Sequence, residues 1–359
     1  MLAPSAQGAR TLATASKRIG SFAQDGSFLA WTARPSTRFF CDRPYVQELT
    51  TGTRRVLAGS FCPSGITIGH GRALWATPPL LCGNCVGRGV QTATFWHPRA
   101  QFVGDFEEDP AGDYMGRRLS ALASDQGLHV LSYVDYQPTA GDPCSGGCSS
   151  WDIVRGRILR LQEDKLERVG GVLRARLLAV GGGRIAFAPA MNPSDGPPVK
   201  VAEDGPIDVV DRTGALVAEV FPAGTALALA VSHTEVAVLL EKNDGSRDIE
   251  RYLLADQSPV ATTAVPMGTS PFGFDMAGKW IIYHKGRQIF ATDRTGTPQP
   301  VLVLQTLPIG LSIEGNRIAW AENHNGHHRI RAVAPPAGVG LSSAKAVFGS
   351  GEVPTPLEF

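Results

Sequence analysis

Short apolar segments recur along this chain, and most of them end at an aromatic residue. Their last positions are spaced by 37 to 58 residues, with a mean of about 48, and six of the seven copies end in Trp, Tyr or Phe. Short apolar runs bounded by turn residues are typical of buried strands. The pattern therefore predicts one strand that recurs seven times, at Phe28–Trp31, Arg72–Trp75, Val130–Tyr133, Arg184–Phe187, Glu235–Val238, Trp280–Tyr283 and Arg317–Trp320.

A second apolar strand precedes each of these markers, and turn residues separate the two. Most copies end in Gly, Asp or Asn, which accept the positive φ angles of two-residue hairpin turns. The copies are 17–26, 65–71, 118–127, 176–183, 226–234, 271–278 and 309–316. Each marker is therefore predicted to be the second strand of a hairpin.

The second half of the repeat is clearest in two places. Pro206–Phe221 and Arg287–Val303 both contain Asp-Arg-Thr-Gly between two strands, and Pro44–Gly59 is a looser copy with Thr51 and Gly52 at the turn. Asp opens such turns and Gly closes them. Each repeat is thus predicted to contain four antiparallel strands.

Four antiparallel strands in every 40 to 50 residues or so are typical of a blade of a β-propeller. We expect an all-β fold, with residues 1–359 as one seven-bladed propeller domain; six or eight blades, or a pair of β-sandwiches, are the alternatives. The blades are expected near 17–59, 62–106, 117–171, 174–222, 225–266, 269–304 and 307–335. Residues 9–15 or 345–348 would supply the strand that closes the ring, and we favour the first.

The repeats resemble those of the TolB-like family of β-propellers. Ile289–Val303 and Ile207–Val220 carry the family's strand leading into Asp-x-x-Gly and a final short strand. The resemblance implies the propeller architecture and covers most of the chain. The loops after the marker strands of blades 2, 3 and 4 are longer than the family pattern expects, so the family's cell-envelope partners do not carry over.

Composition and charge exclude only a few classes of function. A formal net charge of +1 gives no electrostatic footprint for nucleic acid. No apolar run is long enough to span a bilayer, and residues 1–18 lack the apolar block of a signal peptide. GxSxG, HExxH and Walker motifs are absent from the sequence, so we assign no catalytic residue and no cofactor. We expect a monomer.

All six cysteines fall within residues 41–148. The predicted topology puts them on one face, in loops of blades 1, 2 and 3. Three disulfides are one interpretation, and sequence proximity favours Cys41–Cys62, Cys82–Cys85 and Cys144–Cys148. A zinc site built from the last four cysteines, or free thiols, are the alternatives.

Disulfides would indicate an oxidising compartment. We therefore expect an extracellular or cell-envelope protein whose signal is missing from this sequence, with the cytoplasm as the alternative. A candidate metal site lies in the expected hairpin of blade 7, where His324, His327 and His328 are close in sequence.

The expected function is a non-enzymatic binding or scaffold propeller that presents loops of the cysteine-bearing face to a protein or glycan partner. One alternative is a hydrolase or lyase with a site, including a metal, in the central channel. Another is a propeller module of a cell-envelope assembly.

Overall fold

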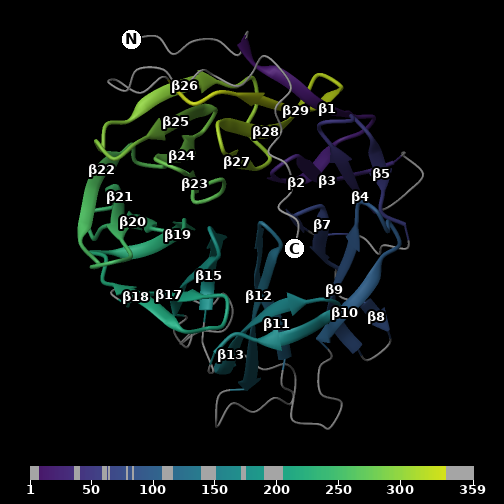
Figure 1. The fold of residues 1–359 in the computed structure, drawn as a ribbon, viewed down its shortest axis with the longest axis horizontal. Coiled ribbons are helices and arrows are strands. Elements are labelled where there is room, and N and C mark those ends of the chain that lie inside the picture. The colour runs from purple at the N-terminus through teal and green to yellow at the C-terminus, as the bar shows by residue number, and fades with distance from the viewer. Residues whose placement is uncertain are drawn as a thin grey trace.

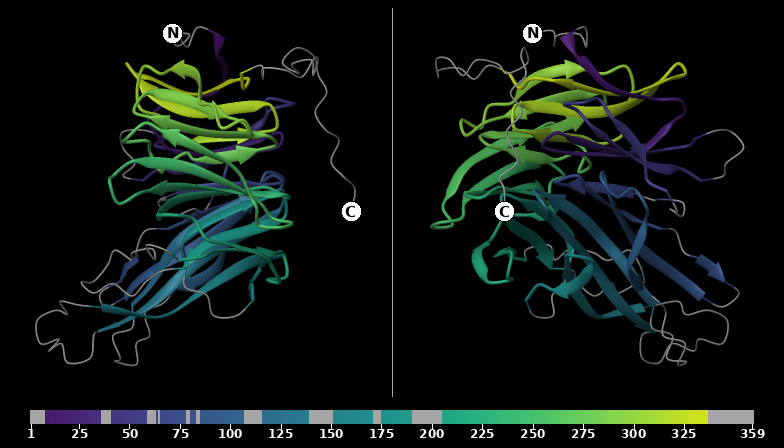
Figure 2. Two further views of the ribbon diagram at one scale, coloured as in Figure 1. Left: turned by 90° about the vertical axis from the view of Figure 1, so that its left-hand side faces the viewer. Right: turned by 45° about the vertical axis from the view of Figure 1, so that its right-hand side comes forward.

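The computed structural model describes residues 8–35, 41–58, 63, 65–77, 80–82, 85–106, 116–138, 151–170, 175–189 and 205–336. These residues form seven four-stranded antiparallel blades around one axis, as Figure 1 shows face-on and Figure 2 from the side. The predicted seven-bladed propeller is confirmed. Within the described part of the chain, no helix has the length and apolar character that a membrane crossing needs.

Blades 1 to 6 follow the chain from the first strand to the fourth, and blade 7 takes its outer strand from the N-terminal part of the chain. Blade 1 contains β2 (Ile19–Asp25), β3 (Phe28–Ala33), β4 (Arg43–Glu48) and β5 (Arg54–Val56). Blade 2 contains β6 (Gly65–Gly69), β7 (Arg72–Ala76), β9 (Cys85–Thr94) and β10 (Gln101–Phe106), with the short β8 (Leu80–Cys82) paired to β9. Blade 3 contains β11 (Gly116–Asp125), β12 (Leu128–Pro138), β13 (Trp151–Gln162) and β14 (Lys165–Arg168).

Blade 4 contains β15 (Ala175–Gly181), β16 (Arg184–Pro189), β17 (Ile207–Asp211) and β18 (Leu216–Val220). Blade 5 contains β19 (Thr225–Val231), β20 (Glu235–Glu241), β21 (Arg247–Leu253) and β22 (Pro259–Val265). Blade 6 contains β23 (Asp275–Ala277), β24 (Trp280–Lys285), β25 (Gln288–Thr292) and β26 (Gln299–Val303). Blade 7 contains β27 (Leu311–Glu314), β28 (Arg317–His324), β29 (His327–Val333) and β1 (Arg10–Ala15).

The first strand of every blade lines the central channel. A cavity of about 220 Å³ in the channel is lined by residues of β2, β6, β11, β15, β19, β23 and β27. Because neighbouring strands are antiparallel, the two ends of the channel differ. We call the end with the turns between first and second strands the turn face, and the end with the links between blades and the loops between second and third strands the loop face.

The seven marker residues all lie in second strands, and all are nearly inaccessible to solvent. Seven hydrophobic clusters formed by described residues each join two neighbouring blades, including blade 7 with blade 1. In β20, Val238 packs toward blade 4 while Ala237 and Leu239 pack toward blade 6. The marker strands are apolar at successive positions because they are buried on both sides.

The N-terminal strand closes the ring. β1 pairs antiparallel with β29, from Arg10 opposite Ala332 to Ala15 opposite His328. Blade 1 also holds this strand, because the amide of Gln47 donates to the carbonyl of Leu12 at 3.2 Å. Residues 345–348, the other predicted closing strand, lie outside the described residues.

The two Asp-Arg-Thr-Gly motifs form the same turn between third and fourth strands. Oδ1 of Asp211 accepts the backbone N–H of Thr213 at 2.8 Å and its hydroxyl at 2.6 Å, and Gly214 has φ +91°. Asp293 makes the corresponding bonds with Thr295. Their hydrogen bonds give these motifs a role in turn formation.

A buried ion pair ties blade 5 to blade 6 at the turn face. The side chains of Glu235 and Arg251 are each 1 % exposed and form a salt bridge. Arg251 also donates to the carbonyl of Lys279 at 2.8 Å, and Arg294 reaches the second oxygen of Glu235 at 2.5 Å. Breaking such a pair leaves an uncompensated charge in the interior.

Candidate functional site

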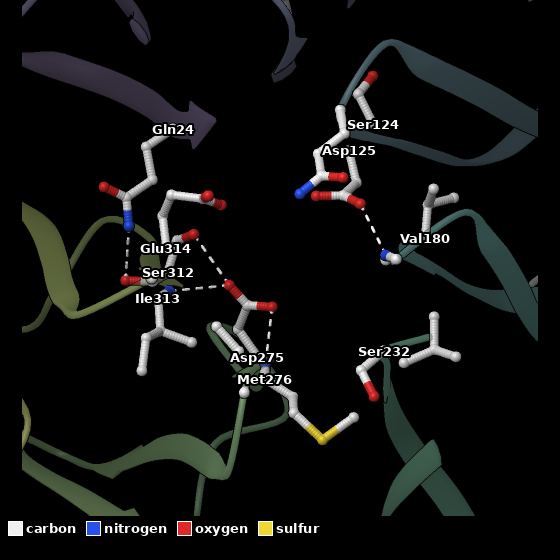
Figure 3. A pocket seen from close by; sticks show the side chains of 17 residues that line it. Gln24, Ser124, Asp125, Val180, Ser232, Asp275, Met276, Ser312, Ile313 and Glu314 are labelled. Atoms are coloured by element: carbon white, nitrogen blue, oxygen red, sulfur yellow. Dashed lines mark hydrogen bonds between the residues drawn. The ribbon is translucent and has the colours of Figure 1, made fainter. Parts of the chain in front are cut away.

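A cavity of about 310 Å³ opens at the turn face of the channel. Three of its lining residues are acidic, namely Asp125, Asp275 and Glu314, and none of the described residues that line it is basic. Figure 3 shows their carboxylates together with Gln24 and Ser312. The cavity thus places three carboxyl groups at one end of the channel.

Three carboxylates converge here because they hold the same place in three repeats. Asp25, Asp125 and Glu314 are the last residues of β2, β11 and β27, the first strands of blades 1, 3 and 7. Each offers an oxygen within 4.8 Å of the other two. Equivalent positions of first strands surround the axis of a propeller, so side chains placed there meet at its centre.

Glycines allow neighbouring turns to pack closely at the turn face. Gly69 and Gly181 end the first strands of blades 2 and 4. A Cβ atom on Gly69 would come within 3.0 Å of the His129 ring, and one on Gly181 would overlap the carbonyl oxygen of Val231. These glycines are required for close approach of neighbouring turns.

Backbone amides of other blades hold most of the acids. Asp25 accepts the N–H groups of His70 at 2.5 Å and Gln126 at 3.0 Å, in the turns of blades 2 and 3. Asp125 accepts the N–H of Gly182 in blade 4 at 2.8 Å. The first structural role of these carboxylates is therefore to tie successive turns together.

Asp275 joins blade 6 to blade 7 in the same manner. Its Oδ2 accepts the N–H of Ile313 and the hydroxyl of Ser312, both at 2.9 Å, as the dashed lines in Figure 3 show. Burial raises the pKa of Asp275, and these hydrogen bonds oppose the rise.

Two members of the cluster, Asp125 and Glu314, have a raised pKa. Burial raises the pKa of Asp125 to about 7, and the charge of Asp25 adds to the effect. Burial also raises the pKa of Glu314 to about 7, with further contributions from Asp25 and Asp125. Carboxylates in this state can exchange a proton with a bound molecule, and their oxygens are ligands that suit Ca²⁺, Mg²⁺ or Mn²⁺.

The sequence carried a signal for this cluster. Each acid stands three positions before the first residue of the next strand, in Gln-Asp-Gly, Ser-Asp-Gln-Gly and Ile-Glu-Gly-Asn. Asp and Gly at a hairpin end are equally the residues of an ordinary turn. Only the register of the repeats shows that the three side chains face one axis.

An apolar groove of about 490 Å³ opens at the loop face, between blades 6, 7 and 1. The link before blade 6 contributes Phe272, and the link before blade 7 contributes Leu307 and Ile309. Phe22 and His284 complete this part of the lining. Phe272 is 79 % exposed and Leu307 is 61 % exposed, which is unusual for large apolar side chains that line one groove.

The link that carries Phe272 is held by hydrogen bonds. The N–H of Ser270 donates to the carbonyl of His284 at 2.8 Å, and the N–H of Phe272 donates to the Ser270 hydroxyl at 3.1 Å. The guanidinium of Arg247 donates to the carbonyl of Thr269. Phe272 is therefore displayed on a fixed backbone and not on a free loop.

The structure describes three of the six cysteines that were predicted to lie on one face. Cys41 lies between β3 and β4 and is disulfide-bonded. Cys82 and Cys85 are directly opposite in the β8–β9 hairpin. Cys62, Cys144 and Cys148 lie outside the described residues, and the three pairings stay a prediction.

The predicted histidine site lies on the hairpin between β28 and β29. His324 is opposite His327 in the strand register, and Nδ1 of His328 is 2.9 Å from Oδ1 of Asn323. Burial, Lys17 and Arg18 lower the pKa of His328. Metal binding by these histidines stays a prediction.

Comparison with known proteins shows the fold. No family model matches the chain, and no curated protein matches it. Similar solved structures include the β-propeller domain, of open velcro topology, of the Trilobed protease from Pyrococcus furiosus. That domain has a TM-score of 0.52 and 8% identity over 88% of this chain and 94% of its own.

Two further structures show the same likeness. Hsv2 from Kluyvelomyces marxianus has a TM-score of 0.51 and 10% identity over 89% of this chain and 97% of its own. Pyrococcus horikoshii acylaminoacyl peptidase has a TM-score of 0.54 and 7% identity over 85% of this chain and 48% of its own. At these identities both likenesses concern the fold alone.

Proposed function

We propose that this protein is a non-enzymatic binding propeller that captures a protein partner in the apolar groove of its loop face. The observation that carries the proposal is the pair of exposed side chains Phe272 and Leu307 beside one groove. Clustered apolar side chains of this kind mark interaction surfaces in soluble proteins. Aromatic residues are also enriched among those that supply most of the binding free energy.

The rigidity of the groove adds to the argument. Ordering a loop during association opposes binding, so a side chain that is already fixed loses less entropy when a partner covers it. The hydrogen bonds of Ser270 and Phe272 fix this link before any partner arrives. The groove therefore has the properties of a preorganised binding surface.

The test is to pan a peptide display library against the protein and to measure the enriched peptides on variants. Phe272→Ser combined with Leu307→Ser is expected to weaken them at least about 30-fold, the effect of losing a central apolar contact. Leu216→Ser, at a 61 % exposed position of the outer strand β18, is the control and is expected to change nothing. Peptides that bind the double variant as tightly as the parent protein would contradict the proposal.

A glycan partner is the other form of the same proposal, since aromatic side chains also cover sugar rings. A glycan array on the parent protein and on the Phe272→Ser/Leu307→Ser variant separates the two. Signals lost only in the variant identify a glycan in the groove.

Proton exchange at the turn face favours a second candidate function, a hydrolase. Asp125 and Glu314 both have a pKa raised to about 7 and line the same cavity, so each can give or take a proton near neutral pH. Chromogenic ester, glycoside and phosphate substrates would be hydrolysed with an optimum near neutral pH, and Glu314→Gln would abolish the reaction. Equal rates with the parent protein and with Glu314→Gln would exclude this role.

We also propose that the protein resides in an oxidising compartment. The disulfide at Cys41 supports export to the cell envelope or beyond. The TolB-like assignment rests on the Asp211 and Asp293 turns and is also a proposal, as is a place within an envelope assembly. Fractionation of cells that produce the protein from its native gene tests the compartment, and recovery in the cytoplasm would contradict it.

A further inference from the structure

Exposed basic residues lie near the loop-face groove. Lys285 and Arg287 are exposed on the hairpin that follows His284, a lining residue. The guanidinium of Arg287 reaches the carbonyl of Gln305 at 3.4 Å, two residues before Leu307. These two cations therefore stand along the blade 6 side of the groove.

A second pair of cations stands on the opposite side. Lys17 and Arg18 are exposed and come directly before the strand that supplies Gly20 to the lining. Both depress the pKa of His328 by their charge, which places them together at the junction of blades 7 and 1. Each pair thus lies close in sequence to a lining residue of the groove, His284 for one pair and Gly20 for the other.

One acidic neighbour of the groove, Asp42, is already paired. The Asp42 carboxylate lies against Gly20, where an added Cβ would overlap it. Arg34 faces Asp42 at 3.9 Å, so this side chain offsets little of the surrounding positive charge. The whole chain has a net charge of only +1, and the basic groups around the groove are therefore a local feature.

We propose that the groove binds an acidic segment of a protein that carries an aromatic or large aliphatic side chain. The apolar side chain of the segment packs between Phe272 and Leu307. The carboxylates on either side face Lys285 and Arg287 on one flank and Lys17 and Arg18 on the other. This inference rests on the proposed binding function and names the chemistry of its partner.

The two parts of the surface have different roles. Apolar burial in the groove supplies most of the affinity. The exposed cations attract the acidic flanks, exclude basic segments and speed association, and salt weakens each of these effects. A nucleic acid would meet the cations but would leave the apolar groove without a matching side chain.

The test is fluorescence anisotropy with three synthetic peptides of about twelve residues and one oligothymidylate. The peptides share a central Trp-Leu pair and are flanked by Asp and Glu, by Ser, or by Lys. At about 50 mM NaCl we expect the acidic peptide to bind about ten-fold more tightly than the serine peptide. At about 500 mM NaCl the two affinities are expected to converge.

Two variants separate charge from apolar contact. Lys285→Glu combined with Arg287→Glu is expected to remove most of the acidic peptide's advantage and to leave the serine peptide unchanged. Lys165→Glu combined with Arg168→Glu, on the outer strand β14, makes the same change in net charge and is the control. Phe272→Ser with Leu307→Ser is expected to weaken every peptide.

Each outcome has one meaning. If the serine or lysine peptide binds as tightly as the acidic one, and Phe272→Ser with Leu307→Ser weakens it, the partner chemistry is wrong and the binding function stands. If no peptide responds to that variant, both fail. Tighter binding of the oligothymidylate than of the acidic peptide would also overturn the inference.

Discussion

Removing one carboxyl group from the turn-face cluster is expected to stabilise the protein at alkaline pH. Asp125 has a pKa near 3.8 in the unfolded chain and about 7 when folded. Between these values the folded state keeps a proton that the unfolded state has lost. The stability that Asp125 contributes is therefore present below about pH 4 and is lost as the pH rises through 7.

The magnitude follows from the size of this shift. One pKa unit corresponds to about 1.4 kcal/mol, so a rise of about three units corresponds to about 4 kcal/mol between full protonation and full ionisation. Asp125→Asn removes the titrating group and retains an oxygen to accept the N–H of Gly182. It also removes a neighbouring charge that raises the pKa of Glu314.

The assay is urea unfolding of the parent protein and of Asp125→Asn from about pH 4.5 to about pH 8.5. The difference in free energy of unfolding is expected to move toward the variant by several kcal/mol across this range. Asp211→Asn is the control, because the Thr213 hydroxyl lowers the pKa of Asp211, so its stabilisation is lost only below about pH 4 and the difference for this variant is expected to stay constant across the range. A difference that does not change with pH, or that moves toward the parent protein, would refute the reasoning.

Three further predictions concern the ring and its cysteines. Glu235→Gln is expected to destabilise the fold by about 3 to 5 kcal/mol, because it leaves the charge of Arg251 buried without its partner; chemical unfolding measures this, and a loss below about 1 kcal/mol would contradict it. Gly181→Ala is expected to lower the melting temperature by several degrees, because its methyl group overlaps a carbonyl oxygen of blade 5, whereas Gly65→Ala, in open space, is expected to leave it unchanged; equal melting temperatures would show that the ring does not need the glycine. Alkylation of the unfolded, unreduced protein followed by peptide mass analysis is expected to leave Cys41 unmodified, and a labelled Cys41 would show that it is a free thiol.

The architecture was predictable because it is written several times along the chain. The second strand of each blade, which ends at residues such as Trp75 and Trp320, is buried on both of its faces. This strand therefore stays apolar in every repeat, and its recurrence can be counted. The same logic reaches the acid cluster only when the repeats are aligned at their turns. Asp25 and Glu314 are 289 residues apart in sequence and meet only because the ring closes.

The groove could not be predicted in this way. Phe272 and Leu307 lie in links whose sequences differ, and an apolar residue in a link is as consistent with burial as with exposure. Phe274, two residues after Phe272, is buried, while Phe272 is 79 % exposed. Which of the two faces solvent depends on the Ser270 turn, and the pattern of apolar residues does not reveal that geometry.

The pairing of β1 with β29 has a consequence for synthesis. Residues 10–15 leave the ribosome before the rest of the ring, yet their partner strand ends at Val333, so β1 stays without this partner until blade 7 has been translated. Closing a loop of this length is entropically unfavourable and slow. Blades 1 to 6 can acquire structure as they emerge, but completion of the ring must wait for the last blade, and until then the unpaired edge of β1 is open to pairing with other chains.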